Sequence, residues 1–470
     1  MGAQPSQSAT AWQGLAARVA TILRPGDPGF DMAARPQNLR YAGVVPQGVA
    51  RCRTAEHAQA AMRWALEQRM PLALRAGGHS YAGCSTTDGL LIDLRPMNAT
   101  AVEDGLATFG GGALNADLYK ALGARSLAVT HGRCMGVGAS AFLLGGGIGF
   151  AMRDRGLGCD AVASATVIRP DGALAHASRT ENPDLFWALC GGGGGNLGIA
   201  VEWTVRTVQA EPVTVFDIRW HGAGQDEAFW SLAGRLQAAP ARMGSKLSVS
   251  VHGAARPARL ETRLLGQLRG PASELRDLLA PVLARHKPDA ATVRHLPYWA
   301  GQAVLSEAGP DMSYQETSQY CGTLPHGAVE EAFRRLRASP GTSGEAAFKM
   351  FHVGGRIREV PAAATAYVHR DAEWLTGTEL TWTRVDSTRR VEAALAWQRA
   401  FHHAVSDLLG PGGSYQNFPD PGLEEPAMAY YGDNLPRLRA IKAALDPDDV
   451  FTPPRRQGIN GGKARVAMAR

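Results

Sequence analysis

The sequence has no apolar run approaching the roughly 18 residues that a membrane-spanning helix needs, so we expect no membrane partner. The first residues, MGAQPSQSATAW, lack the basic start and apolar core of a secretory signal, which favours a cytoplasmic location. The net charge is only +6 over 470 residues, and the basic residues are dispersed, so nucleic acid is not an expected partner. Arginine greatly outnumbers lysine, as is typical of a GC-rich genome, and we expect a bacterial source.

Cysteine is scarce, with six residues that are 25 or more positions apart. There is no CxxC pair of the kind that binds zinc and no dense disulfide framework, so we expect no metal and a reducing compartment. The sequence also lacks the GxxxxGKS/T phosphate loop, the GxSxG nucleophile turn and the HExxH zinc motif. These absences argue against the P-loop, hydrolase and metalloprotease classes that carry those motifs.

One segment matches a dinucleotide-binding motif in its residues but not in its predicted structural context. Gly193-x-Gly195-x-x-Gly198 fits GxGxxG, which has meaning after a strand and at the start of a helix. Here a helix is predicted before the glycines and a strand after them, so the order is reversed. We therefore reject a Rossmann site.

Glycine is abundant: 55 residues, concentrated in the first 200 and gathered in short clusters between apolar, strand-like runs. Glycine costs backbone entropy on folding, so such clusters indicate backbone conformations or close approaches that a Cβ would block. A large, flat, phosphate-bearing cofactor would account for several clusters at once.

The residue pattern predicts an α+β protein in two parts. Up to about residue 211, strands alternate with helices, one of which starts after the N-cap Thr54. From residue 212 the pattern predicts an antiparallel sheet with helices on one side. Its expected strands are 213–220, 246–253, 259–268, 346–353 and 378–386, and its expected helices lie near 225–238, 271–285, 327–338 and 388–409. The segment after residue 410 is rich in turn residues and then predicts a helix over 434–445.

Two glycine-flanked segments carry nucleophilic side chains. RAGGHS, residues 75–80, reads as a strand that enters a turn whose successive N–H groups suit an anion. The second segment, HGRCMGVG, starts at His131 and contains Cys134. A histidine or cysteine beside glycine is by itself more often structural than reactive. The two segments together are far more specific.

These segments belong to a wider resemblance. RAGGHSYAG, HGRCMGVGASAFLLGGGIG, ENPDLFWALCGGGGGNLGI and the C-terminal YYGDNLPRLRAIKAALDPDDVF resemble, in order, motifs of berberine-bridge-enzyme-like oxidases of the vanillyl-alcohol oxidase/PCMH-type superfamily. The match spans residues 40–460. It implies a PCMH-type FAD-binding domain of two α/β subdomains over 1–211 and a substrate domain over 212–411. It also implies that a C-terminal element, 412–470, returns to the FAD domain.

The resemblance implies that FAD is attached twice, through its 8α-methyl to His79 and through C6 to Cys134. Both residue types are nucleophiles suited to an electrophilic flavin ring. Attachment through His79 alone is the alternative. Val137 would leave room for O₂ beside the flavin. The other residues implied in cofactor binding are Arg75, Ala76, Gly77, Gly78, Ser80, Gly138, Gly145, Gly146, Asn196, Gly198 and Ile199.

The resemblance also implies three catalytic residues. Tyr415, in the YxN motif with Asn417, would serve as the base over the flavin, and Tyr367 would assist from the segment YVHRD. A free tyrosine has a pKa of about 10, so ionising it at pH 7 costs about 4 kcal/mol unless neighbours help. The alternative for Tyr415 is a turn tyrosine that only packs.

The implied reaction is a two-electron oxidation, with hydride passing to flavin N5 and O₂ reduced to H₂O₂. Its substrate would be a small molecule: an alcohol, a sugar hydroxyl or an activated C–H of a carbohydrate or secondary metabolite. The alternatives are a dehydrogenase that uses another acceptor, an oxidative cyclase of natural-product biosynthesis, and a non-catalytic carrier. We expect a monomer or homodimer. Aromatic residues could stack on the substrate or form core: Trp299, Tyr314, Tyr320, Trp374 and Trp382.

Overall fold

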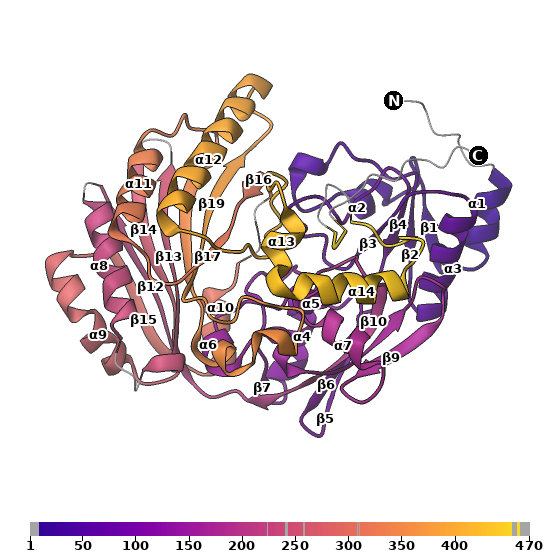
Figure 1. Cartoon of the computed structure of the whole chain (residues 1–470), viewed down its shortest axis with the longest axis horizontal. Coiled ribbons are helices and arrows are strands. Elements are labelled where there is room, and N and C mark those ends of the chain that lie inside the picture. Colours follow the sequence, from indigo (N-terminus) through magenta and orange to yellow (C-terminus); the bar gives the residue numbers. More distant parts are fainter. Residues whose placement is uncertain are drawn as a thin grey trace.

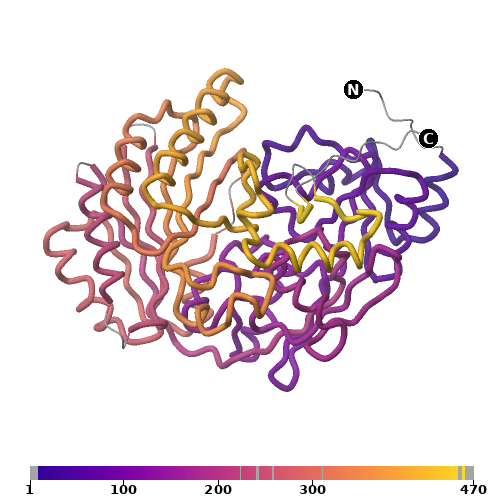
Figure 2. Tube along the Cα trace, in the orientation of Figure 1, coloured from indigo at the N-terminus to yellow at the C-terminus, as the bar shows by residue number. Residues whose placement is uncertain are grey.

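The two strand patterns in the sequence fold into two lobes that lie side by side (Figure 1). The computed structural model describes residues 9–453 and 458–460, apart from 223, 240–242, 257, 258, 308 and 310. One lobe contains several small sheets and the other a single large sheet. The C-terminal segment crosses from the large sheet to the first lobe (Figure 2).

The N-terminal part of the first lobe is a four-stranded sheet in which β2, β4 and β3 are parallel and β1 is antiparallel to β2. Its order is β1 (Thr21–Leu23), β2 (Gly48–Arg51), β4 (Leu90–Asp93) and β3 (Leu72–Arg75). The helices of this part are α1 (Ala9–Ala16), α2 (Phe30–Ala34) and α3 (Ala55–Glu67). As predicted, the Thr54 side chain caps α3 by accepting from the His57 N–H at 3.4 Å.

The second part of this lobe is a five-stranded antiparallel sheet. Its order is β5 (Thr100–Glu103), β6 (Leu106–Gly110), β10 (Ile199–Arg206), β8 (Val162–Ile168) and β9 (Leu174–Ser178). A short pair joins β7 (Leu127–Ala128) to β11 (Val208–Gln209). The helices here are α4 (Asn115–Gly123), α5 (Ala139–Leu144), α6 (Met152–Arg155) and α7 (Pro183–Leu189). Helix α7 precedes the glycine run and β10 follows it, so the predicted order of helix, glycine run and strand is confirmed.

The large sheet of the other lobe is antiparallel throughout. Its order is β15 (Ala290–Leu296), β12 (Val213–His221), β14 (Arg259–Leu268), β13 (Leu247–Arg256), β18 (Ala346–His352), β19 (Trp374–Trp382) and β16 (Ser313–Glu316), with β17 (Gln319–Cys321) also on β19. Its outer face is covered by α8 (Gln225–Gln237), α9 (Ala272–Arg285), α11 (His326–Arg337) and α12 (Thr388–Leu409) (Figure 1). Helix α10 (Tyr298–Leu305) packs on β12 and β15.

Alternation along the strands separates the two faces of this sheet. On β18, Phe348 and Met350 belong to the buried core under the helices, whereas Lys349 and Phe351 line a cavity on the opposite face. The hydrophobic core and the cavity wall are therefore made by the same strands.

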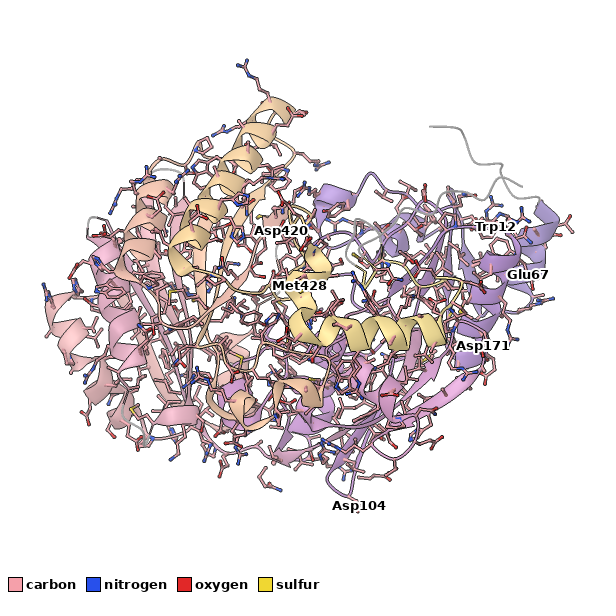
Figure 3. The ribbon with its side chains drawn as sticks, in the orientation of Figure 1. Trp12, Glu67, Asp104, Asp171, Asp420 and Met428 are labelled. Atoms are coloured by element: carbon pink, nitrogen blue, oxygen red, sulfur yellow. The ribbon has the colours of Figure 1, made fainter. Side chains whose placement is uncertain are left out.

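The C-terminal segment carries α13 (Pro426–Tyr431) and α14 (Leu435–Leu445) onto the first lobe. Asp420 and Met428 lie where the lobes meet (Figure 3). There the Gln315 amide of β16 donates to Asp420 at 3.2 Å. Further along, the Tyr431 hydroxyl donates to the Gly192 carbonyl at 2.9 Å. These bonds tie the segment to both lobes.

The α+β class with an antiparallel, helix-covered sheet is confirmed. The predicted strand 378–386 is observed earlier, at Trp374–Trp382, and β15, β16 and α10 were not predicted. The domain boundaries at 211/212 and 411/412 stay predictions, and residues 1–8, 454–457 and 461–470 of those domains lie outside the described residues. No helix within the described ranges is long and apolar enough to cross a membrane.

We expect Phe348→Ala to destabilise the large-sheet lobe by about 3–5 kcal/mol, because it empties a fully buried ring site. Phe351→Ala is the matched control, since Phe351 lies on the same strand, is half-buried and faces the cavity. Denaturant unfolding should give a clearly lower midpoint for Phe348→Ala than for Phe351→Ala. Equal midpoints would contradict the assignment of the two faces.

Candidate active site

A cavity of about 870 Å³ lies between the small sheets and the large one. Its walls include both segments that were singled out in the sequence, the glycine run after α7 and the inner face of the large sheet. Of the predicted cofactor residues, it is lined by Arg75, Ala76, Gly77, Gly78, His79, Ser80, Cys134, Val137, Gly138, Asn196 and Gly198.

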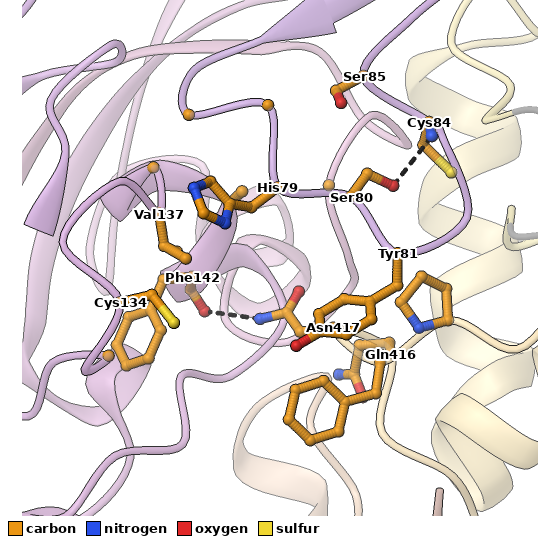
Figure 4. A pocket seen from close by; sticks show the side chains of 18 of the residues that line it. His79, Ser80, Tyr81, Cys84, Ser85, Cys134, Val137, Phe142, Gln416 and Asn417 are labelled. Atoms are coloured by element: carbon orange, nitrogen blue, oxygen red, sulfur yellow. Dashed lines mark hydrogen bonds between the residues drawn. The ribbon is translucent and has the colours of Figure 1, made fainter. Parts of the chain in front are cut away.

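The loop after β3 and the segment before α5 contact each other through their backbones. A Cβ on Gly77 would collide with the Gly136 carbonyl oxygen and the Gly138 nitrogen. A Cβ on Gly136 would lie 2.7 Å from His79 Nε2. This contact brings His79 and Cys134 onto one wall of the cavity, with Val137 beside them (Figure 4).

The turn that holds His79 has the backbone of an anion site. Within the described part of the chain, the main-chain N–H groups of Gly77, Gly78, His79 and Ser80 donate to no residue. Successive free N–H groups at a glycine turn suit a phosphate. This turn follows β3 at the carboxyl edge of a parallel sheet, where ligands of such sheets bind.

Arg75 has a different role from the one expected of a cofactor ligand. Its buried guanidinium donates to the carbonyls of Ala33, Ala34 and Ser85. Burial lowers its pKa to about 10. Because these carbonyls occupy its donors, Arg75 fixes the shape of the turn, and its side chain is not free to bind a phosphate.

The two predicted attachment residues are in opposite states. Burial lowers the pKa of His79, which keeps the imidazole neutral, although Glu307 opposes this shift. Burial raises the pKa of the Cys134 thiol, and the carboxylate of Glu307 raises it further. The imidazole is thus in its nucleophilic form, whereas the sulfur still carries its proton.

Tyr415 lines the cavity, and three N–H groups converge on its phenol oxygen. That oxygen accepts from Gly147 N at 3.3 Å, from Ile148 N at 3.2 Å and from Asn417 Nδ2 at 3.1 Å. Burial raises the pKa of Tyr415 to about 12, while these donors act in the other direction because they stabilise the phenolate. Tyr415 and Asn417 are therefore brought together as predicted.

Tyr367, Gly145, Gly146 and Ile199 are not part of the cavity wall. Tyr367 is fully buried behind it and shares a 2.6 Å hydrogen bond with the Tyr320 hydroxyl. A Cβ on Gly145 would strike Asn417, and one on Gly146 would lie 2.6 Å from the Tyr367 ring. The absence of a Cβ at these two glycines thus makes room for the side chains of Asn417 and Tyr367, while their assignment to cofactor binding stays a prediction.

The YVHRD segment supplies no free positive charge to Tyr415. Arg370 makes a bidentate ion pair with Asp160, with both contacts at 2.8 Å. His369 is buried, which lowers its pKa to about 4. Of the five aromatic residues weighed from the sequence, Tyr314 alone lines this cavity.

Charged groups on the sheet face of the cavity were not predicted from the sequence. Lys349 of β18 lies 2.5 Å from Glu379 of β19 and 3.8 Å from Glu316 of β16. All three are buried or nearly so, and Glu316 Oε2 has no hydrogen-bond partner among the described residues. The hint in the sequence was a lysine in the middle of the mostly apolar strand AAFKMFH.

The cavity combines a glycine turn suited to an anion, two nucleophilic side chains and a buried phenol. This combination is that of a flavin-linked oxidoreductase. Residues 46–178 match the model of an FAD binding domain, and residues 414–459 match that of berberine and berberine-like proteins. The chain belongs to the berberine-bridge-like family of FAD-linked oxidoreductases. The free N–H groups of the turn and the backbone-lined cradle fit FAD.

Relatives of known name cover nearly the whole chain. A glucooligosaccharide oxidase from Sarocladium strictum is 31% identical, over 93% of this chain and 92% of that protein. A xylooligosaccharide oxidase from Thermothelomyces thermophilus is 32% identical, over 89% of this chain and 88% of that protein. The solved glucooligosaccharide oxidase from Acremonium strictum, described with 6-S-cysteinyl, 8α-N1-histidyl FAD, has a TM-score of 0.83 at 27% identity, over 94% of this chain and 97% of that one. The family resemblance found in the sequence is confirmed.

We expect Gly77→Ala to lower the FAD bound per chain at least about tenfold, because the new Cβ forces the two loops apart and displaces the turn. Gly327→Ala is the control, since a Cβ there meets nothing within 4 Å. Flavin absorbance relative to protein absorbance in the purified variants measures the effect. Full FAD content in Gly77→Ala would show that the loop contact is dispensable.

Proposed function

We propose that this protein is an oxidase that takes two electrons from a sugar hydroxyl and passes them through doubly attached FAD to O₂, with release of H₂O₂. The observation that carries the proposal is one cavity that brings together His79, Cys134 and the three-donor environment of the Tyr415 oxygen. The named oligosaccharide oxidases among the relatives support the choice of substrate class.

The double attachment rests on side-chain chemistry at one wall. His79 is neutral and offers a ring nitrogen as a nucleophile. Cys134 offers a sulfur in the same cavity, on the other side of Val137 (Figure 4). Two attachments from one wall would fix the flavin and leave the sheet face open for a substrate.

FAD, when bound, supplies the acceptor for a hydride. The task left to the protein is to remove the hydroxyl proton and hold the sugar in place. Tyr415 takes that proton in its phenolate form, and the N–H groups of Gly147, Ile148 and Asn417 stabilise the negative oxygen of that phenolate before the transfer. The Asn417 amide is itself oriented by its bond to the Phe142 carbonyl at 3.1 Å (Figure 4).

The opposite wall suits a polyhydroxylated ring. Tyr314 of β16, with Tyr81 and Phe418 from the other segments packed beside it, offers aromatic surface on which a sugar can stack. The unpartnered Oε2 of Glu316 can accept from a sugar hydroxyl. Val137, half-buried on the flavin side, is proposed to leave space for O₂.

The attachment makes a prediction about pigment. After acid precipitation, the yellow colour should stay with the protein pellet, and proteolysis should give one flavin joined to peptides that contain His79 and Cys134. Cys134→Ala should keep pigment on the His79 peptide alone. Colour in the supernatant of the wild type would overturn the proposed attachment.

The function predicts that oligosaccharides bleach the visible flavin absorbance without air and release H₂O₂ in air. Tyr415→Phe should slow bleaching about 10²–10⁴-fold without loss of flavin, because the base is gone. Since the pKa of Tyr415 is raised to about 12, wild-type bleaching should accelerate as the pH rises through neutrality, and the Phe variant should lose that dependence. Absence of bleaching with gluco-, xylo- and chitooligosaccharides would count against the sugar substrate.

A further inference from the structure

A carboxylate from the large-sheet lobe lies against the predicted cysteine attachment point. Glu307 follows α10, 173 residues from Cys134 in the sequence. Its backbone is held in place on the cysteine segment, because Met135 N donates to Glu307 O and Glu307 N donates to Arg133 O, both at 3.2 Å. These bonds form a parallel bridge between Cys134 and Glu307.

The two carboxylate oxygens of Glu307 have different partners. Oε1 accepts from the Cys134 Sγ–H at 3.0 Å. Oε2 lies 2.8 Å from Arg133 Nη2. The guanidinium therefore fixes the carboxylate in the orientation in which its other oxygen meets the thiol proton.

The charge of Glu307 is supported by its surroundings. Burial opposes ionisation, but Arg133, the hydrogen bond from Cys134, Lys349 and Arg263 hold the pKa of Glu307 below its usual value. The same carboxylate raises the pKa of the thiol that it contacts. A thiol held in its protonated form is a poor nucleophile, so attachment through sulfur requires a proton acceptor.

His79 needs no such acceptor. Its imidazole is neutral and already carries a free electron pair on one ring nitrogen. Of the two attachment residues, only Cys134 must lose a proton from its attacking atom, and only Cys134 donates a hydrogen bond to a carboxylate in the described structure.

We propose that Glu307 is the base in flavin attachment: it takes the Cys134 proton as the sulfur bonds to flavin C6. This rests on the proposed double attachment. The S–H bond breaks and its proton goes to Glu307, the S–C6 bond forms, and the hydrogen on C6 leaves as a proton. The two electrons pass into the flavin ring, and O₂ removes them as H₂O₂. Because the sulfur becomes more acidic as it bonds, the transfer takes place within that step.

The titratable and charged groups that face this pair come from both lobes. They are His79, Tyr81, Tyr119, Arg133, Arg263, Tyr314 and Lys349. Burial keeps the histidine neutral and raises the pKa of each of these tyrosines. The histidine and the tyrosines therefore do not change charge between about pH 7 and about pH 9.

The test follows attachment itself. Full-length apoprotein from riboflavin-starved cells is mixed with FAD in air, and samples are quenched in acid over time. Peptide mass analysis then measures two products: flavin bound to the His79 peptide alone, and flavin bound to both the His79 and the Cys134 peptides. We expect Glu307→Gln to slow the Cys134 bond roughly 100-fold while the His79 bond still forms, which also shows that the variant folds.

Two variants and a pH series separate a base from a structural contact. Glu307→Asp keeps the carboxylate and should recover part of the rate. Glu345→Gln removes another cavity carboxylate, paired with Arg256 at 2.8 Å, and should leave the Cys134 bond rate unchanged. The Glu307→Gln rate should rise about tenfold per pH unit as solvent base replaces the carboxylate. The wild-type rate should change far less between about pH 7 and about pH 9, where the raised pKa of Glu316, about 8, affects it only through Lys349.

The outcomes distinguish the two proposals. If the wild type joins FAD to both peptides and Glu307→Gln does so at the same rate, the role of Glu307 is overturned and double attachment stands. If the wild type never forms the Cys134 bond, double attachment fails and the inference fails with it. A slow, pH-dependent Cys134 bond in Glu307→Gln alone supports the assignment.

Discussion

The backbone contact between the loop after β3 and the segment before α5 determines the rest of the site. Gly77 touches Gly136 and Gly138 with no side chain between them, so any Cβ at this point would separate the two loops. The segment that contains Cys134 is also held by α4, because the Asn115 side chain at the start of that helix donates to the Cys134 carbonyl at 2.9 Å. An imidazole and a thiol from distant parts of the first lobe therefore lie on one wall at a set separation.

The cavity wall opposite His79 and Cys134 is the inner face of the large sheet. Its strands bury one face under helices, and the alternation of side chains sends the remaining residues into the cavity. Buried charges are costly unless paired, and Lys349 is paired with two carboxylates. These charges add little to stability compared with apolar residues of similar size, so their place on the cavity wall points to recognition of a polar substrate.

The Tyr415 oxygen depends on three separate parts of the chain. The phenol comes from the C-terminal segment, the N–H groups of Gly147 and Ile148 from the region after α5, and the Ser318 hydroxyl accepts from Tyr415 N at 3.0 Å. The Cys134 thiol is in the same situation, since the large-sheet lobe supplies the carboxylate of Glu307 that faces it. Both lobes therefore contribute to the surroundings of the Tyr415 oxygen and of the Cys134 thiol.

The sequence by itself determined the local features: the Thr54 cap, the alternating strands, the reversed order around the glycine run and the loops that carry His79 and Cys134. Each depends on neighbours within a few residues, where cap chemistry and glycine backbone freedom act. Only the tertiary structure decided three further features. Arg75 donates its hydrogen bonds to backbone carbonyls, and Tyr367 lies behind the cavity wall. Glu307 contacts the thiol of Cys134, which is 173 residues away in the sequence. These are contacts between distant segments, and they are set by how the lobes pack, which no local pattern encodes.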